Sequence, residues 1–130
     1  MFVEHIAIWT FDLERLRDFY VDYFNAEVGP KYENRENGFQ SYFCKLTKGA
    51  RLELMQMPGI VSKPELDPAL QLSGLIHLAV AVGSKLGVDN LYAKMKRNGL
   101  VLVDEPHFTG DGYYEFTVLD PDGNRIEITI

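Results

Sequence analysis

Apolar residues recur along the first half of the chain with the spacing of a strand, then of a helix, then of strands again. Residues 2–9 are rich in β-branched and aromatic types and predict a strand. After Asp12, a suitable N-cap, the apolar positions follow a helical period and predict a helix; they are 13, 16, 19, 20, 23 and 24. A loop around a short strand is expected over 25–38. Two strands are expected at 39–46 and 51–57, with the turn Lys48-Gly49-Ala50 between them.

The second half repeats this order. Residues 58–74 carry three prolines and no clear period, which indicates a linker or flap. A strand is expected at 75–82 and a helix at 87–98, with Gly99 well placed to end it. Further strands are expected at 100–104, 113–119 and 124–130, the last two separated by the turn Asp120-Pro121-Asp122-Gly123.

The two halves align as an internal repeat. His5-Ile6-Ala7-Ile8 matches His77-Leu78-Ala79-Val80 at an offset of 72 residues, and Arg51-Leu52-Glu53-Leu54 matches Arg125-Ile126-Glu127-Ile128 at an offset of 74. The fold class predicted is therefore α+β, one domain over 1–130 made of two βαβββ modules. Module one is 1–57, the linker is 58–74 and module two is 75–130. We expect the modules to form a curved mixed sheet.

Strand parity places unusual residues on one face of this sheet. Successive side chains of a strand point to opposite faces, so His5, Glu53, His77 and Glu127 each lie opposite an apolar face that can pack on a helix. A lone histidine or glutamate at such a position is more often structural. Here two of the chain's three histidines and two glutamates occupy equivalent positions in the repeat. Trp9, Arg51 and Met55 share the same strand faces and are candidate substrate contacts.

Two imidazoles and two carboxylates suit a divalent metal ion. The pattern predicts Zn, Ni or Co, with Mn or Fe as further candidates, in a site that keeps one or two positions open for water or substrate. A metal ion with open positions can act as a Lewis acid, whereas a structural metal ion has all its positions filled by the protein.

Composition and charge narrow the function classes. Of the 130 residues, 46% are hydrophobic and 25% charged, as in globular proteins. The net charge of −6 argues against a nucleic-acid partner, and no apolar run is long enough for a membrane span. A single cysteine, Cys44, excludes an internal disulfide, and the absence of an export signal predicts a cytoplasmic protein.

The same motifs carry a family resemblance over essentially the whole chain. The chain resembles the vicinal oxygen chelate superfamily, and within it the glyoxalase I and bleomycin-resistance group. The motifs that carry the resemblance are the four repeat segments above, Phe19-Tyr20 in the first helix, and Asp120-Pro121-Asp122-Gly123-Asn124-Arg125-Ile126-Glu127, which is the most specific.

The resemblance implies a metal held by His5, Glu53, His77 and Glu127. It also implies a lyase or isomerase acting on the hemithioacetal of an α-ketoaldehyde such as methylglyoxal, with Glu127 as the main proton shuttle and Glu53 able to serve the opposite face. A homodimer is expected. Two alternatives stay open: a drug- or metabolite-binding protein of the bleomycin-resistance type, and another metal enzyme of the superfamily, a ring-cleaving dioxygenase or an epimerase. Met55-Gln56-Met57-Pro58 departs from the glyoxalase I pattern, and the thiol of the substrate is left open.

Overall fold

The computed structural model describes residues 1–67 and 70–130. Contacts divide the chain into two compact units, residues 1–63 and 64–130. Each unit contains one of the predicted modules. The predicted linker 58–74 forms no helix or strand where it is described; residues 68–69, including Pro68, lie outside the described residues.

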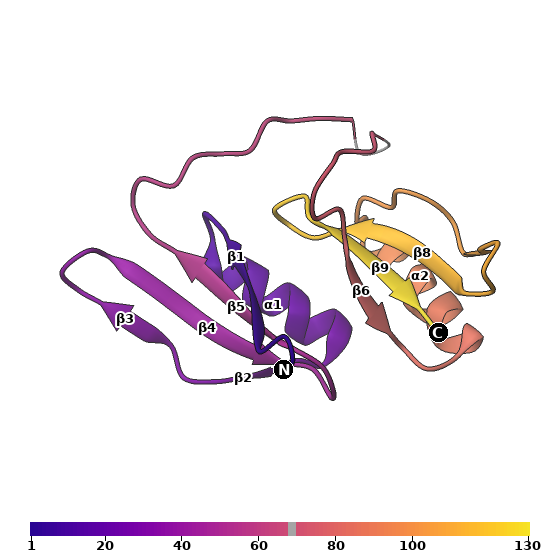
Figure 1. Cartoon of the computed structure of the whole chain (residues 1–130), viewed down its shortest axis with the longest axis horizontal. Helices are drawn as coiled ribbons and strands as arrows, with labels where there is room; N and C mark the ends of the chain where they lie inside the picture. The colour runs from indigo at the N-terminus through magenta and orange to yellow at the C-terminus, as the bar shows by residue number, and fades with distance from the viewer. Residues whose placement is uncertain (68–69) are drawn as a thin grey trace. The chain divides into compact units, whose positions relative to one another are not determined.

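Module one is a mixed sheet with a helix on one face (Figure 1). The strand order is β1-β5-β4-β2, with β1 parallel to β5 and the other pairs antiparallel, and β3 also pairs with β4. The elements are β1 (His5–Trp9), α1 (Leu13–Phe24), β2 (Glu27–Val28), β3 (Tyr32–Asn34), β4 (Phe39–Lys45) and β5 (Arg51–Gln56).

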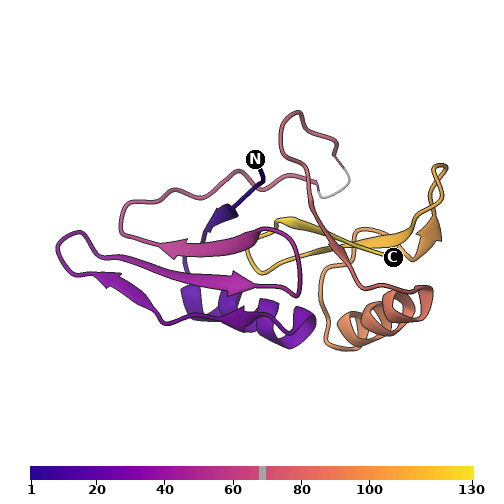
Figure 2. The ribbon, with the colours of Figure 1, turned by 60° about the horizontal axis from the view of Figure 1, so that its bottom comes forward.

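Module two repeats this plan as β6-β9-β8-β7, with β6 parallel to β9. Its elements are β6 (Leu78–Ala81), α2 (Lys85–Arg97), β7 (His107–Phe108), β8 (Tyr114–Leu119) and β9 (Arg125–Thr129). Figure 2 shows each helix running along one face of its own sheet. The α+β class and the two mixed-sheet modules are confirmed. None of the helices in the described part is long and apolar enough to cross a bilayer.

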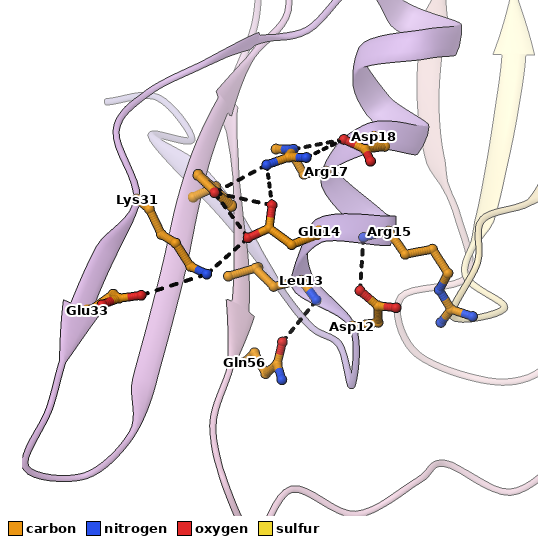
Figure 3. Close-up of polar contacts among 10 residues, drawn as sticks. Asp12, Leu13, Glu14, Arg15, Arg17, Asp18, Lys31, Glu33 and Gln56 are labelled. Carbon is orange, nitrogen blue, oxygen red and sulfur yellow. Dashed lines mark hydrogen bonds and ion pairs between the residues drawn. The ribbon is translucent and has the colours of Figure 1, made fainter.

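The predicted helix starts are close to those observed. The Asp12 side chain accepts a hydrogen bond from the Arg15 amide at 3.0 Å, the N-cap expected from the sequence. The first amide of α1, that of Leu13, donates to the Gln56 side chain at 2.9 Å (Figure 3). The second helix begins at Lys85, two residues earlier than predicted, because the Ser84 side chain caps it.

Several predicted strands are shorter or differently placed. The first begins at His5 rather than at residue 2, because its parallel partner β5 begins at Arg51, which pairs with His5. The strand expected at 100–104 is wrong: it is reduced to a single bridge between Leu102 and Val118. Pairing stops there because the Asp104 carboxylate, rather than a backbone carbonyl, accepts the next amide hydrogen bond, from Thr117 at 2.6 Å.

The remaining differences are short strands absent from the prediction. The stretch 25–38 contains two of them, β2 and β3, rather than one, and the two-residue β7 was not expected. Strands of two or three residues are too short to show a period of two in the sequence.

Each sheet is joined to its helix by a buried tyrosine. The Tyr42 hydroxyl donates to Glu14 at 3.1 Å and accepts from Arg17 at 3.2 Å. In module two, the Tyr114 hydroxyl donates to Asp89 at 2.8 Å and accepts from Lys85 at 3.1 Å. The two tyrosines are 72 residues apart, the same offset as the two repeat histidines. The repeat therefore extends into the core.

In module one, the Glu14 carboxylate that bonds to Tyr42 is also held by a lysine. The Lys31 ammonium donates to Glu14 at 2.9 Å and lies 3.8 Å from Glu33 (Figure 3). This hydrogen bond is the main reason that the pKa of the Glu14 carboxyl is lowered from its ordinary value. The carboxylate stays charged and keeps its bond to Tyr42 at neutral pH.

Candidate functional site

The first His–Glu pair lies on the open face of module one. Side chains of β1 and β5 alternate as predicted: Leu52 and Leu54 are buried toward the helix, and Glu53 points to the other face. The His5 Nε2 atom lies 3.6 Å from the Glu53 Oε2 atom. The structure thus brings these two predicted ligands together.

Module two carries an equivalent pair. The His77 Nε2 atom lies 3.4 Å from the Glu127 Oε2 atom. The side-chain exposures match those of the first pair: 40% and 17% for His77 and Glu127, against 41% and 17% for His5 and Glu53. The two modules therefore place the same chemistry in the same environment.

In each pair, the spacing of the two donor atoms allows both of them to bind the same metal ion. Two ligand atoms about 2.1 Å from a common zinc ion at a tetrahedral angle are about 3.4 Å apart. The observed separations of 3.6 and 3.4 Å meet this requirement with little movement. Among residues 1–67 and 70–130, there is no group of three or more His, Cys, Asp or Glu side chains that could hold a metal ion. Each module therefore presents a pair.

The imidazole of His5 is oriented by a neighbouring carboxylate. Its Nδ1 atom lies 2.5 Å from Glu4 Oε2, and because a carboxylate can only accept, Nδ1 carries the proton. The lone pair then sits on Nε2, the nitrogen that faces Glu53. The bond from His5 is also the main reason that the pKa of Glu4 is lowered. Sequence reasoning missed Glu4, which no periodicity distinguishes.

Arg51 and Phe43 also contact the groups that hold the His5 imidazole in place. The Arg51 guanidinium donates to Glu4 and lies 4.1 Å from the centre of the Phe43 ring. The His5 ring meets the same phenyl ring edge to face, with centroids 5.5 Å apart. Arg51, predicted as a substrate contact, therefore lies against Glu4 and Phe43.

The other predicted contacts lie at the far end of the same strands. Trp9 pairs in register with Met55, and its indole is 45% exposed and packs edge to face on Phe39. Along β5, Glu53 lies between Arg51 and Met55.

A hollow of about 380 Å³ lies beside the His77–Glu127 pair. Glu115 and Thr129 line it as cross-strand partners on β8 and β9, and Asp111 lines it from the preceding turn. Burial, and then the neighbouring charge of Glu127, raise the pKa of the Glu115 carboxyl. Strand parity places Thr129 on the same face as Glu127, but sequence reasoning missed Asp111 and Glu115. The alternation of β8, with Tyr114, Phe116 and Val118 buried, was a signal that could have placed Glu115 on the site face.

One family model matches nearly the whole chain. The family model described as "Glyoxalase/Bleomycin resistance protein/Dioxygenase superfamily" matches residues 3–128. The chain is 30% identical over 132 residues to the uncharacterised protein YqjT of Bacillus subtilis, covering 97% of this chain and 96% of that protein.

Solved structures of this fold are also similar. The trypanothione-dependent glyoxalase I of Leishmania major is 27% identical, with a TM-score of 0.71 over 95% of this chain and 82% of that one. A glyoxalase family protein of Enterococcus faecalis is 22% identical, with a TM-score of 0.76 over 98% of this chain and 96% of that one; at this identity the likeness concerns the fold alone.

Proposed function

Because the chain belongs to the glyoxalase, bleomycin-resistance protein and dioxygenase superfamily, we propose that it is a metal-dependent lyase of the glyoxalase I type. The observation that carries the proposal is the repeated His–Glu pair, which has the same exposure and nearly the same donor spacing in both modules. The substrate class proposed is the hemithioacetal of an α-ketoaldehyde such as methylglyoxal. Its two adjacent oxygens suit a site with open positions.

The proposed ligands are His5, Glu53, His77 and Glu127. A divalent ion bound there would supply Lewis-acid polarisation of the two substrate oxygens. Glu4 would hold His5 with its Nε2 lone pair available. Glu53 and Glu127, each 17% exposed, are shielded enough to keep water from competing freely for their carboxylates.

The chemistry requires one proton to move between neighbouring carbons. The C–H proton of the hemithioacetal carbon is removed, and a proton is returned to the adjacent carbon, so the product is a 2-hydroxy thioester isomeric with the substrate. A histidine that ligates through Nε2 and holds its proton on Nδ1 has no free lone pair, which leaves the glutamates as bases. We assign the shuttle to Glu127, which lines the hollow in module two, and a ligand role mainly to Glu53.

The test is a pair of isosteric substitutions. Glu127→Gln keeps the side-chain size and one candidate ligand oxygen but removes the base, so we expect a loss of about 10²–10⁴-fold in kcat with most of the metal retained. Glu53→Gln is expected to be milder in kcat. Metal content by elemental analysis and turnover of methylglyoxal–thiol adducts are measured on the same samples. The matched control is Glu36→Gln, a surface glutamate of module one.

Two results would overturn the proposal. The first is failure of the purified chain to take up Zn, Ni or Co at about one ion per chain. The second is a Glu127→Gln variant that keeps both its metal and full kcat, which would remove the shuttle assignment.

We also propose a homodimer. The strands β1 and β6 are edge strands of their own sheets, and proteins commonly cover such edges by pairing. Light scattering at micromolar concentration tests this, and a stable monomer contradicts it.

A further inference from the structure

The hollow in module two has a strongly acidic lining. Three carboxylates border it, those of Asp111, Glu115 and Glu127, and neither lysine nor arginine is among the residues that line it. Glu127 lies against His77. Within the described residues, Asp111 and Glu115 have no hydrogen-bond or ion-pair partner, so neither carboxylate is tied to another side chain.

The group closest to offering a positive charge is already engaged. His107 lies opposite Glu115 in the register of β7 and β8. Its Nδ1 atom makes a hydrogen bond of 2.8 Å with the Glu105 carbonyl oxygen, and its side chain lies on the exposed strand β7. The charge of His107 lowers the pKa of Glu115, but burial and Glu127 raise it more, so one imidazole does not offset the three carboxylates of the lining.

A buried hydroxyl in the same hollow lacks a partner. Thr129 is 8% exposed, and within the part of the chain that the structure describes its Oγ1 atom makes no hydrogen bond. It lies on the same face of β9 as Glu127, two residues away, and directly across from Glu115. An unpaired buried hydroxyl is costly, and a ligand with N–H donors would satisfy it.

The third acidic group is presented by a closed turn. The Thr109 and Tyr113 backbones are joined by a hydrogen bond of 2.9 Å, and the Thr109 hydroxyl accepts from the Tyr113 amide at 2.9 Å. Gly112 occupies the left-handed region at φ +99°, which permits the reversal. The turn fixes Asp111 at the rim, and the half-exposed Tyr113 ring adds an aromatic face that favours cations.

We propose that this hollow is a subsite for a positively charged group of the substrate, an alkylammonium held by Asp111 and Glu115 with Thr129 as a hydrogen-bond acceptor. The inference rests on the proposed function for the reacting end of the substrate. It names the class of thiol: one that carries an ammonium group near the sulfur. A thiol whose corresponding group is a carboxylate meets like charges in the hollow and is disfavoured.

The activity test compares three thiols of similar size. The methylglyoxal adducts of N,N-dimethylcysteamine, 2-mercaptoethanol and 3-mercaptopropionate differ mainly in carrying an ammonium, a hydroxyl or a carboxylate, and the tertiary amine cannot close its adduct into a thiazolidine. We expect kcat/KM to fall in that order, with about tenfold between neighbours, the effect of roughly 1.4 kcal/mol. Asp111→Asn and Thr129→Val should each reduce the preference for the ammonium, whereas Glu36→Gln should leave it unchanged.

A binding test separates this inference from the proposed function. The zinc-loaded protein is titrated with 2-(methylthio)ethylammonium and with 2-(methylthio)ethanol, neither of which can react, and amide shifts of Asp111, Glu115 and Thr129 are followed by NMR. Tighter binding of the ammonium that is weakened by Asp111→Asn and Thr129→Val supports the subsite, even if none of the adducts turns over. Equal binding of the two probes, or binding indifferent to both substitutions, overturns it even if the glyoxalase reaction is found.

Discussion

Removal of the Glu4 carboxylate should weaken metal binding through His5. In the structure the His5 imidazole is held by a bond from Nδ1 to Glu4, which in turn accepts from Arg51. In Glu4→Ala both ring tautomers and rotations of the ring become accessible. Only some of these states present the Nε2 lone pair toward Glu53, so part of the metal-binding free energy is spent on selecting them.

The expected loss is about tenfold in zinc affinity. Carboxylates that orient a ligating histidine typically contribute about 10–100-fold in affinity. Glu4 is half-exposed, so water replaces part of the lost bond, and the lower end of that range applies. Glu4→Gln, whose amide oxygen can still accept from Nδ1, should lie between the wild type and Glu4→Ala. Arg51→Ala should have a smaller effect, since Arg51 reaches the ring only through Glu4 and Phe43.

The assay is competition with a chromophoric zinc chelator, together with ¹⁵N shifts of the His5 ring in the metal-free protein. The ring shifts report the tautomer directly and do not depend on activity. Glu36→Gln serves as a charge-matched control, and His77 provides an internal control because Ile76, not a carboxylate, precedes it. If Glu4→Ala keeps wild-type zinc affinity and unchanged His5 ring shifts, then Glu4 does not orient the ligand.

Three further outcomes follow from the cores of the modules. Cys44 is fully buried, and burial raises its pKa to about 11, so about 0.1% is thiolate at pH 8 and Ellman's reagent should react only after unfolding. Gly38→Ala should cost about 1 kcal/mol more in urea-unfolding free energy than Gly49→Ala: both have positive φ, but an added Cβ lies 2.9 Å from Pro58 only at position 38. Leu16→Ala should lower the free energy of unfolding by about 2–5 kcal/mol, since Leu16 is completely buried; a loss below 1 kcal/mol by the same method would contradict its place in the core.

The parts of the fold that sequence predicts well are those in which a period repeats several times. The stripe from Leu13 to Phe24 and the alternation in Arg51–Gln56 are long enough to fix both the element and its buried face. This is why the pairing of His5 with Glu53 and of His77 with Glu127 follows from parity and the repeat.

The parts that sequence misses depend on side chains meeting across the chain. Asp104 ends a predicted strand by accepting a hydrogen bond from Thr117, a contact that no local pattern encodes. Glu4 becomes a partner of Arg51 only after β1 and β5 have paired. The hollow requires the turn at Asp111 to approach β9, which strand parity alone does not indicate.

The hydrogen bonds of Tyr42 and Tyr114 join each sheet to its helix, but the charged partners follow in opposite order along α1 and α2. This difference affects how easily the start of each helix opens. In α1 the acid Glu14 lies in the first turn, where it favours the helix dipole, whereas α2 begins with Lys85 and has no acid in its first turn. The amino end of α2 should therefore open more readily than that of α1. Opening there releases Tyr114 from its bond with Lys85, and the next residue on β8 is Glu115. Module two should therefore have the softer support beneath its hollow, and module one the stiffer one.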